Sequence, residues 1–344
     1  RRAGALYGAR RSGQVAVATG FGGNAPKSPP CGPPWPGCMA TLQGFRGGQI
    51  DKARRFFYAA GRNAINLALM QDAQPPSPTP ALLGPDDPAP FSVVNPRGRT
   101  DLLLFCDHAG RAFPATLDTL GLGPRELDQH IAWDIGIAGL GRRLSAALDA
   151  PLFLTAYSRL VIDCNRHLDD PTSIPQESDR TPIPGNRGLT PAERKQRQAE
   201  IFAPYHAALG ALIQQRLDDG HVPVIVSLHS FTPVMNGFQR PWHVGVLWNR
   251  DARLAVPLMQ RLAQEPDLVV GDNEPYSGRD GHGYSIKAHA EALGLAHGLL
   301  EIRQDLIAEE AGQDRWAEIL HRVLLDVLGR SILHERHSGE GRAP

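Results

Sequence analysis

The segment around residues 160–164 combines a run typical of a buried strand with side chains that bind anions. Arg159 precedes the run, and Asn165 and Arg166 follow it directly. A guanidinium group is a planar donor that pairs with a carboxylate through two parallel hydrogen bonds. Two arginines and an asparagine around one strand end therefore predict a pocket for a carboxylate-bearing substrate.

Two other strand-like runs have a histidine at or just after their carboxyl ends. His108 follows residues 101–106, and His229 ends the run 222–229. Two histidines from different strands, together with a carboxylate, would make a catalytic zinc site with one position open for water. The alternative for each is a structural histidine fixed by hydrogen bonds, because no HExxH helix or cysteine cluster accompanies them.

A further run, residues 299–303, carries Glu301 among apolar neighbours. A carboxylate in such surroundings is costly unless it is paired or used in chemistry. Burial raises its proton affinity, which suits a general base. The alternative is an internal ion pair with Arg303 or another arginine. An acid, histidines and arginines near strand ends together indicate hydrolysis of an amide in an acidic substrate.

His130 and Asp134 form another pair of chemically capable side chains. They lie four residues apart, a spacing that predicts a shared helix face. The alternative is a surface pair without a role in a site.

Two glycine-rich stretches, residues 271–278 and 281–284, carry polar and tyrosyl side chains. They could close over a substrate, with Tyr284 at the gate. The alternative is a surface connection between a strand and a helix. Neither stretch has the spacing of a phosphate-binding or dinucleotide-binding loop.

The elements that must position these residues alternate along the chain from about residue 86. Buried strands separated by amphipathic helices predict an α/β fold with a parallel or mixed sheet between helical layers. In such sheets the chemistry gathers beyond the carboxyl ends of the strands. The predicted strands are residues 101–106, 152–157, 160–164, 222–229, 244–248, 268–270 and 298–302, and the predicted helices are 125–148, 191–219, 252–264, 285–293 and 305–328.

Charge is distributed unevenly along the 344 residues. Of 36 basic and 36 acidic residues, residues 1–69 hold ten basic and one acidic, which leaves 26 basic and 35 acidic residues, a net of −9. The acidic charge of residues 70–344 disfavours a nucleic-acid partner.

The sequence contains no run of 18 apolar residues, the length that would predict a membrane span. Four cysteines without a CxxC pair fit a reducing compartment, so we expect a cytoplasmic protein.

The composition also predicts the domain organisation. Residues 1–69 are rich in Gly, Arg and Pro, and we expect a non-native or disordered extension there, with Met70 as the true start. An organelle-import leader is the alternative. We expect a flexible lead-in over residues 70–90, one catalytic domain over 91–330 and a disordered tail over 331–344.

Several of these segments resemble the N-formylglutamate amidohydrolase family, in the expected order over roughly residues 100–310. The matching pieces are residues 107–111, 130–136, 158–166, 228–233, 248–251, 271–278 and 300–305. The family is distantly similar to zinc carboxypeptidases. That similarity implies a three-layer α/β fold with an eight-stranded mixed sheet flanked by helices.

The more distant similarity also implies roles for individual residues. His108 and His229 fall at zinc ligands, and Glu301 falls where the water-activating glutamate lies. Asn165 and Arg166 resemble the pair that holds the substrate's carboxylate. The third position after the first histidine, a glutamate ligand in carboxypeptidases, is Arg111 here. The third ligand must then come from elsewhere, and Asp134 is the candidate.

The resemblance implies metal-dependent hydrolysis of an N-acylated acidic amino acid, with N-formyl-L-glutamate as the expected substrate and a role in histidine degradation. It implies zinc or another divalent metal, and a small N-acyl amino acid as partner, with no nucleic acid or membrane; the oligomeric state stays open. The predicted substrate-binding residues are Arg159, Asn165, Arg166, Arg111 and Tyr284. Alternatives are an amidohydrolase of another N-acyl amino acid, or a non-catalytic carboxylate-binding protein.

Overall fold

The computed structural model describes residues 81–280 and 283–337, all within the unit Gln74–Pro344. The expected extension over residues 1–69, most of the lead-in and residues 338–344 lie outside the described residues. No helix among the described residues is long and apolar enough to cross a bilayer.

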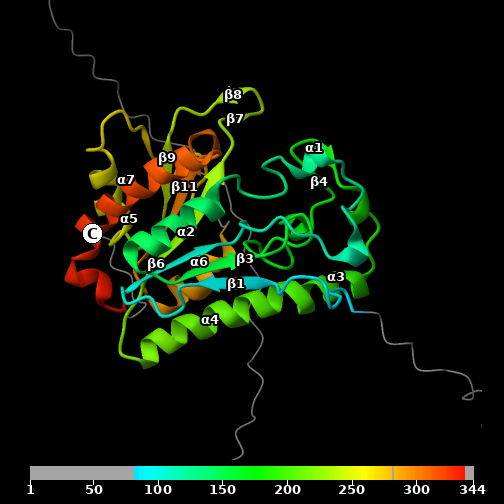
Figure 1. The fold of residues 1–344 in the computed structure, drawn as a ribbon, viewed down its shortest axis with the longest axis horizontal. Helices are drawn as coiled ribbons and strands as arrows, with labels where there is room; N and C mark the ends of the chain where they lie inside the picture. Colours follow the sequence, from blue (N-terminus) through cyan, green and yellow to red (C-terminus); the bar gives the residue numbers. More distant parts are fainter. Residues whose placement is uncertain (1–80, 281–282, 338–344) are drawn as a thin grey trace, which may run out of the picture. The chain divides into compact units, whose positions relative to one another are not determined.

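The central feature is a mixed sheet of seven strands in the order β1-β3-β2-β6-β11-β9-β10 (Figure 1). Strands β3, β2, β6 and β11 run parallel to one another, whereas β1 pairs antiparallel with β3, and β9 with β11. The predicted α/β class is therefore confirmed, and the described sheet has one strand fewer than the eight that the resemblance implies. Its strands are β1 (Phe91–Val94), β2 (Leu102–Cys106), β3 (Leu152–Thr155), β6 (Val224–Phe231), β9 (Val244–Leu247), β10 (Val270–Asp272) and β11 (His297–Arg303).

Helices cover both faces of this sheet, which gives three layers. Helices α2, α5 and α7 pack on one face, and α4 with α6 on the other (Figure 1). The central strand β6 shows why, because Val224, Val226 and Leu228 enter one core while Ile225 enters the other. The helices are α1 (Pro124–Leu127), α2 (Ile137–Leu148), α3 (Pro191–Arg197), α4 (Ala203–Asp218), α5 (Ala255–Leu262), α6 (Tyr284–His289) and α7 (Glu310–Leu328).

Two small hairpins complete the described strands: β4 (Glu177–Ser178) with β5 (Thr181–Pro182), and β7 (Val234–Met235) with β8 (Phe238–Gln239).

Capping residues and proline determine where helix α3 begins. Thr190 caps α3 by accepting the Glu193 N–H, with Pro191 in the first turn as predicted. The predicted helix 191–219 continues through a π-helical turn, Gln198–Phe202, into α4.

The predicted strand over residues 160–164 is wrong, because this buried segment is a series of turns. Side chains take the place of a neighbouring strand. Asn186 Nδ2 donates to the Leu160 carbonyl at 2.8 Å, and Arg197 Nη1 donates to the Val161 carbonyl at 2.9 Å. The sheet instead gains β1, which the sequence analysis missed and whose Phe91 stacks on Phe153.

The predicted helix over residues 125–148 is also divided. Only α1 and α2 are helical, and turns separate them, so His130 and Asp134 share no helix face. The turns allow Asp134 to lie next to His108, where its N–H donates to the His108 carbonyl at 2.9 Å. Beyond residue 330 the chain still packs on the domain, since Ser331–His334 form a 3-10 helix and Leu333 is fully buried.

We predict that Asn186→Leu destabilises the fold by about 2–4 kcal/mol, because the carbonyls of Leu160 and Pro175 lose their donor and Arg197 Nη1 loses one of its two acceptors. Chemical denaturation measures this change. The exposed Gln214→Leu on α4 is the matched control, with an expected change below about 0.5 kcal/mol. Equal effects of the two substitutions would contradict a special role for Asn186.

Candidate metal centre and its cavity

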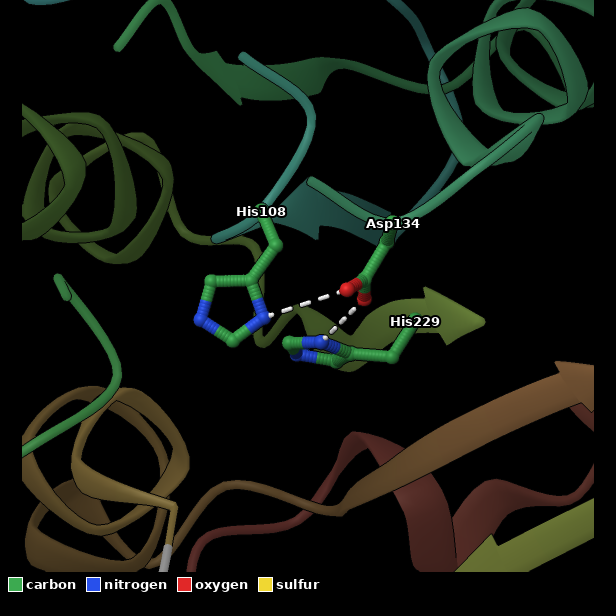
Figure 2. A group of neighbouring side chains, drawn as sticks. All are labelled: His108, Asp134 and His229. Carbon is green, nitrogen blue, oxygen red and sulfur yellow. Dashed lines mark hydrogen bonds and ion pairs between the residues drawn. The ribbon is translucent and has the colours of Figure 1, made fainter. Parts of the chain in front are cut away.

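Three buried side chains from distant parts of the sequence converge at one end of the central strands. His108 follows β2, His229 lies in β6, and Asp134 lies in the turns that precede α2. One potential ligand atom from each lies within 4.8 Å of the others. Figure 2 shows the two imidazole rings next to each other, each with one nitrogen directed at the Asp134 carboxylate. These are the three residues that the sequence analysis named as metal ligands.

The Asp134 carboxylate is shared between both imidazoles. Its Oδ2 lies 2.9 Å from His229 Nδ1, and its Oδ1 lies 3.5 Å from His108 Nδ1 (Figure 2). The Ser230 N–H also donates to Oδ2 at 3.1 Å. The carboxylate is therefore fixed by the strand that carries one of its histidine neighbours.

The donor atoms of His108, Asp134 and His229, and the buried Nδ1 of His108 in particular, suit a metal ion. His108 Nδ1 is buried, and among the described residues it has the 3.5 Å contact with Asp134 but no hydrogen bond. Imidazole nitrogens with a carboxylate oxygen are a donor set that zinc and similar divalent metals accept. His108, Asp134 and His229 could therefore hold a metal ion.

Two further buried carboxylates face the outer ring nitrogens. Asp163 Oδ1 lies 2.7 Å from His108 Nε2, and Asp107 Oδ2 lies 3.4 Å from His229 Nε2. Such partners orient metal-binding histidines and fix which nitrogen is free to ligate. Asp107 Oδ1 is itself held by the hydroxyls of Tyr205 and Ser285, at 2.9 and 2.6 Å.

Opposite charges keep these carboxylates ionised despite their burial. Burial acts to raise the pKa of Asp163, but His108 and Arg159 hold it well below its usual range. Asp134 shows the same balance, because His108 and His229 lower its pKa. Burial would lower the pKa of His229, yet Asp107 and Asp134 raise it to about 10. Three aspartates and one arginine leave two negative charges when both imidazoles are neutral, which a divalent cation would offset.

Glu301 lies beside this group on β11, paired in register with His229 of the neighbouring parallel strand. Its Oε2 is buried and makes no hydrogen bond to any residue that the structure describes. Burial raises the pKa of Glu301 to about 7. The alternative of an ion pair with Arg303 is not what the structure shows, since Arg303 Nε pairs with Asp305 at 2.8 Å.

A cavity of about 170 Å³ opens onto Glu301 and the three candidate ligands. Three of the predicted substrate-binding residues also line it, namely Arg159, Asn165 and Arg166. Arg159 is already paired, with Asp163 at 2.8 Å and Asp134 at 3.5 Å. Arg166 makes no ion pair within the described part of the chain, and its Nη1 donates only to the Asn165 carbonyl.

The structure does not bring Arg111 and Tyr284 to this cavity. Arg111 pairs with Asp128 and lies over the Trp133 ring. The Tyr284 ring packs on His206, 4.9 Å between centroids. His130 does line the cavity, 3.4 Å from Asp179.

Sequence reasoning gave no role to Asp107, Asp163, Tyr276 or Lys287. The two aspartates stood inside matching segments, directly before His108 and two residues before Asn165, so their positions were a usable signal. Tyr276 lines the cavity from the glycine-rich stretch 271–278, for which closure over a substrate was predicted, whereas Lys287 lines it from a segment without a local pattern that marks it.

Comparison with known proteins gives a family and related structures. A model of the N-formylglutamate amidohydrolase family matches residues 100–308, which include every residue of the candidate metal centre. A gene product from Agrobacterium tumefaciens is 37% identical over 73% of this chain and 99% of its own, with a TM-score of 0.70. An N-formylglutamate amidohydrolase from Ralstonia eutropha is 22% identical over 70% of this chain and 97% of its own, with a TM-score of 0.53. No curated protein matches the chain.

We predict that the chain binds one zinc ion and that Asp163→Asn weakens this binding about 10- to 100-fold, because His108 loses its orienting carboxylate. Competition with a chromogenic chelator measures the affinity. Asp128→Asn, which alters the exposed partner of Arg111, should leave it unchanged. Unaltered zinc affinity in the Asp163 variant would contradict the prediction, as would full zinc binding by His229→Ala.

Proposed function

This chain belongs to the N-formylglutamate amidohydrolase family, and from that premise we propose that it is a metal-dependent hydrolase of N-formyl-L-glutamate. The reaction adds water across the formyl C–N bond and gives formate and L-glutamate. The Ralstonia eutropha protein of that name shares its fold. Family membership supports an N-acyl amino acid as substrate, and the cavity's residues support the rest of the proposal.

The observation that carries the proposal is the unpaired carboxylate of Glu301. It is buried beside His229, and it opens onto the same cavity as the three candidate ligands. A buried carboxylate with no partner is unfavourable for stability alone. A general base must have a free oxygen to accept a proton from water, so a carboxylate in that role is expected to lack a hydrogen-bond partner.

Different side chains bind the metal ion and transfer the proton. His108, Asp134 and His229 would hold a metal ion, which when bound polarises the amide carbonyl and lowers the pKa of water. Glu301 takes the proton of the attacking water and delivers it to the nitrogen as the C–N bond breaks. Proton transfer of this kind contributes about 10²- to 10⁴-fold to the rate.

Arg166 and Asn165 hold the α-carboxylate of the substrate. Arg166 is a cavity-lining cation with no carboxylate partner among the described residues. Asn165 uses its Oδ1 to accept the Ser285 N–H at 3.1 Å, so Nδ2 is the group that can donate to a carboxylate. Arg159, with Nη1 and Nη2 directed to Asp134 and Asp163, adds positive charge and keeps both aspartates in place.

We predict that Glu301→Gln lowers kcat for formate release at least about 100-fold and changes KM by less than about threefold, because the amide has similar size but cannot accept the proton. A coupled formate dehydrogenase assay gives both values. Glu318→Gln, exposed on α7, is the matched control and should behave as wild type.

Turnover retained by the Glu301 variant would remove this residue as the base. Formate release can be compared with acetate or succinate release from the corresponding N-acyl glutamates. Hydrolysis of only the longer acyl groups would keep the amidohydrolase and contradict the formyl substrate. Binding of glutamate derivatives without hydrolysis of any would favour a carboxylate-binding protein.

A further inference from the structure

The cavity continues along β11, well beyond the candidate metal centre. His297, Leu299 and Glu301 alternate along this strand, so they project from the same face of the sheet, and all three line the cavity. The four residue steps from His297 to Glu301 span about 13 Å. The space is therefore longer than the reacting amide needs, and its far end lies near His297.

The walls change from apolar to polar along this direction. Leu247, directly opposite Leu299 on β9, and Ile286 on α6 line the middle of the cavity. Beyond them the lining residues are Lys287, Glu291, Asn249 and His297. An apolar passage that ends in polar groups suits a side chain with methylene groups and a polar terminus.

Lys287 and Glu291 are the oppositely charged side chains that line the polar end of the cavity. Glu291 lies 3.7 Å from His297 Nε2. Lys287 makes no ion pair within the described residues, so its ammonium group is available to an anionic group of a ligand.

The position of Lys287 is tied to the α-carboxylate site. Helix α6 begins on Asn165, whose carbonyl accepts the Tyr284 N–H at 3.4 Å and whose Oδ1 accepts the Ser285 N–H at 3.1 Å. Arg166 is the next residue of the chain. The segments that carry Arg166 and Lys287, two cavity cations without ion-pair partners among the described residues, are thus joined by hydrogen bonds to Asn165.

We propose that Lys287 binds the side-chain carboxylate of the substrate and determines the preference for dicarboxylic N-acyl amino acids. The inference rests on the proposed function, because it assigns the second carboxylate of the same substrate. Arg166 and Asn165 hold the α-carboxylate, the methylene groups contact Leu299 and Leu247, and the terminal carboxylate reaches Lys287.

The test compares N-formyl-L-glutamate with N-formyl-L-glutamine, which differ only in the charge of the terminus. Lys287→Met keeps most of the aliphatic side chain and removes the charge. We expect it to lower kcat/KM for the glutamate substrate about 10- to 100-fold, the range of one charge-assisted hydrogen bond, and to change the glutamine substrate less than about threefold. Lys287→Arg should retain the selectivity, and Lys195→Met, exposed on α3, should change neither substrate.

A second readout separates failure of this inference from failure of the proposed function. Calorimetric titration of L-glutamate and L-glutamine does not depend on turnover. Weaker binding of glutamate alone to the Lys287→Met variant supports the carboxylate site even if no N-formyl amino acid is hydrolysed, an outcome that would contradict the proposed reaction. Equal loss of both substrates, or a wild-type protein that does not distinguish glutamate from glutamine, overturns the assignment of Lys287.

Discussion

Three aspartates are buried at one end of the central sheet, and the free energy that this burial costs must be offset by the residues around them. Asp107, Asp134 and Asp163 are each at most 4% exposed. Carboxylates at such depth are strongly unfavourable unless opposite charges and hydrogen bonds offset the lost hydration. His108, His229 and Arg159 provide these contacts, yet two negative charges are left when both imidazoles are neutral. A bound divalent cation would offset this charge, so the same requirement that organises the fold also defines the candidate site.

The buried aspartates need hydrogen-bond and ion-pair partners, and this need explains the irregular segments around the sheet. Residues 158–166 must direct Asp163 toward His108 and Arg159 toward Asp163, while Asn165 reaches α6. Turns allow this, and the buried carbonyls that they leave accept hydrogen bonds from Asn186 and Arg197. Because Asn165 also binds the first turn of α6, the wall that carries Lys287 is fixed by the same segment that fixes the metal centre.

The sequence was informative wherever a local pattern determined position. Alternation of apolar runs and amphipathic helices was enough for the α/β class, and His108, His229 and Glu301 stood in or beside strand-like runs. Asp134 was named through family resemblance, and the helix expected around it was wrong because contact with His108 determines the turns there. The run 160–164 misled because a short run with four apolar residues looks alike in a strand and in a buried turn, and its partners lie 26 and 36 residues away. Lys287 has no sequence signal, since its position follows from a hydrogen bond to Asn165 by its neighbour Ser285.

The most direct test of the account is a titration of metal-free protein with zinc, in which bound metal and the rate of formate release from N-formyl-L-glutamate are measured on the same samples. The account predicts a rate that rises in proportion to bound zinc and reaches its limit at one ion per chain. It also predicts that His229→Ala abolishes both the binding and the rate. Formate release at full rate without bound metal, or stoichiometric zinc that leaves the rate at zero, would contradict it.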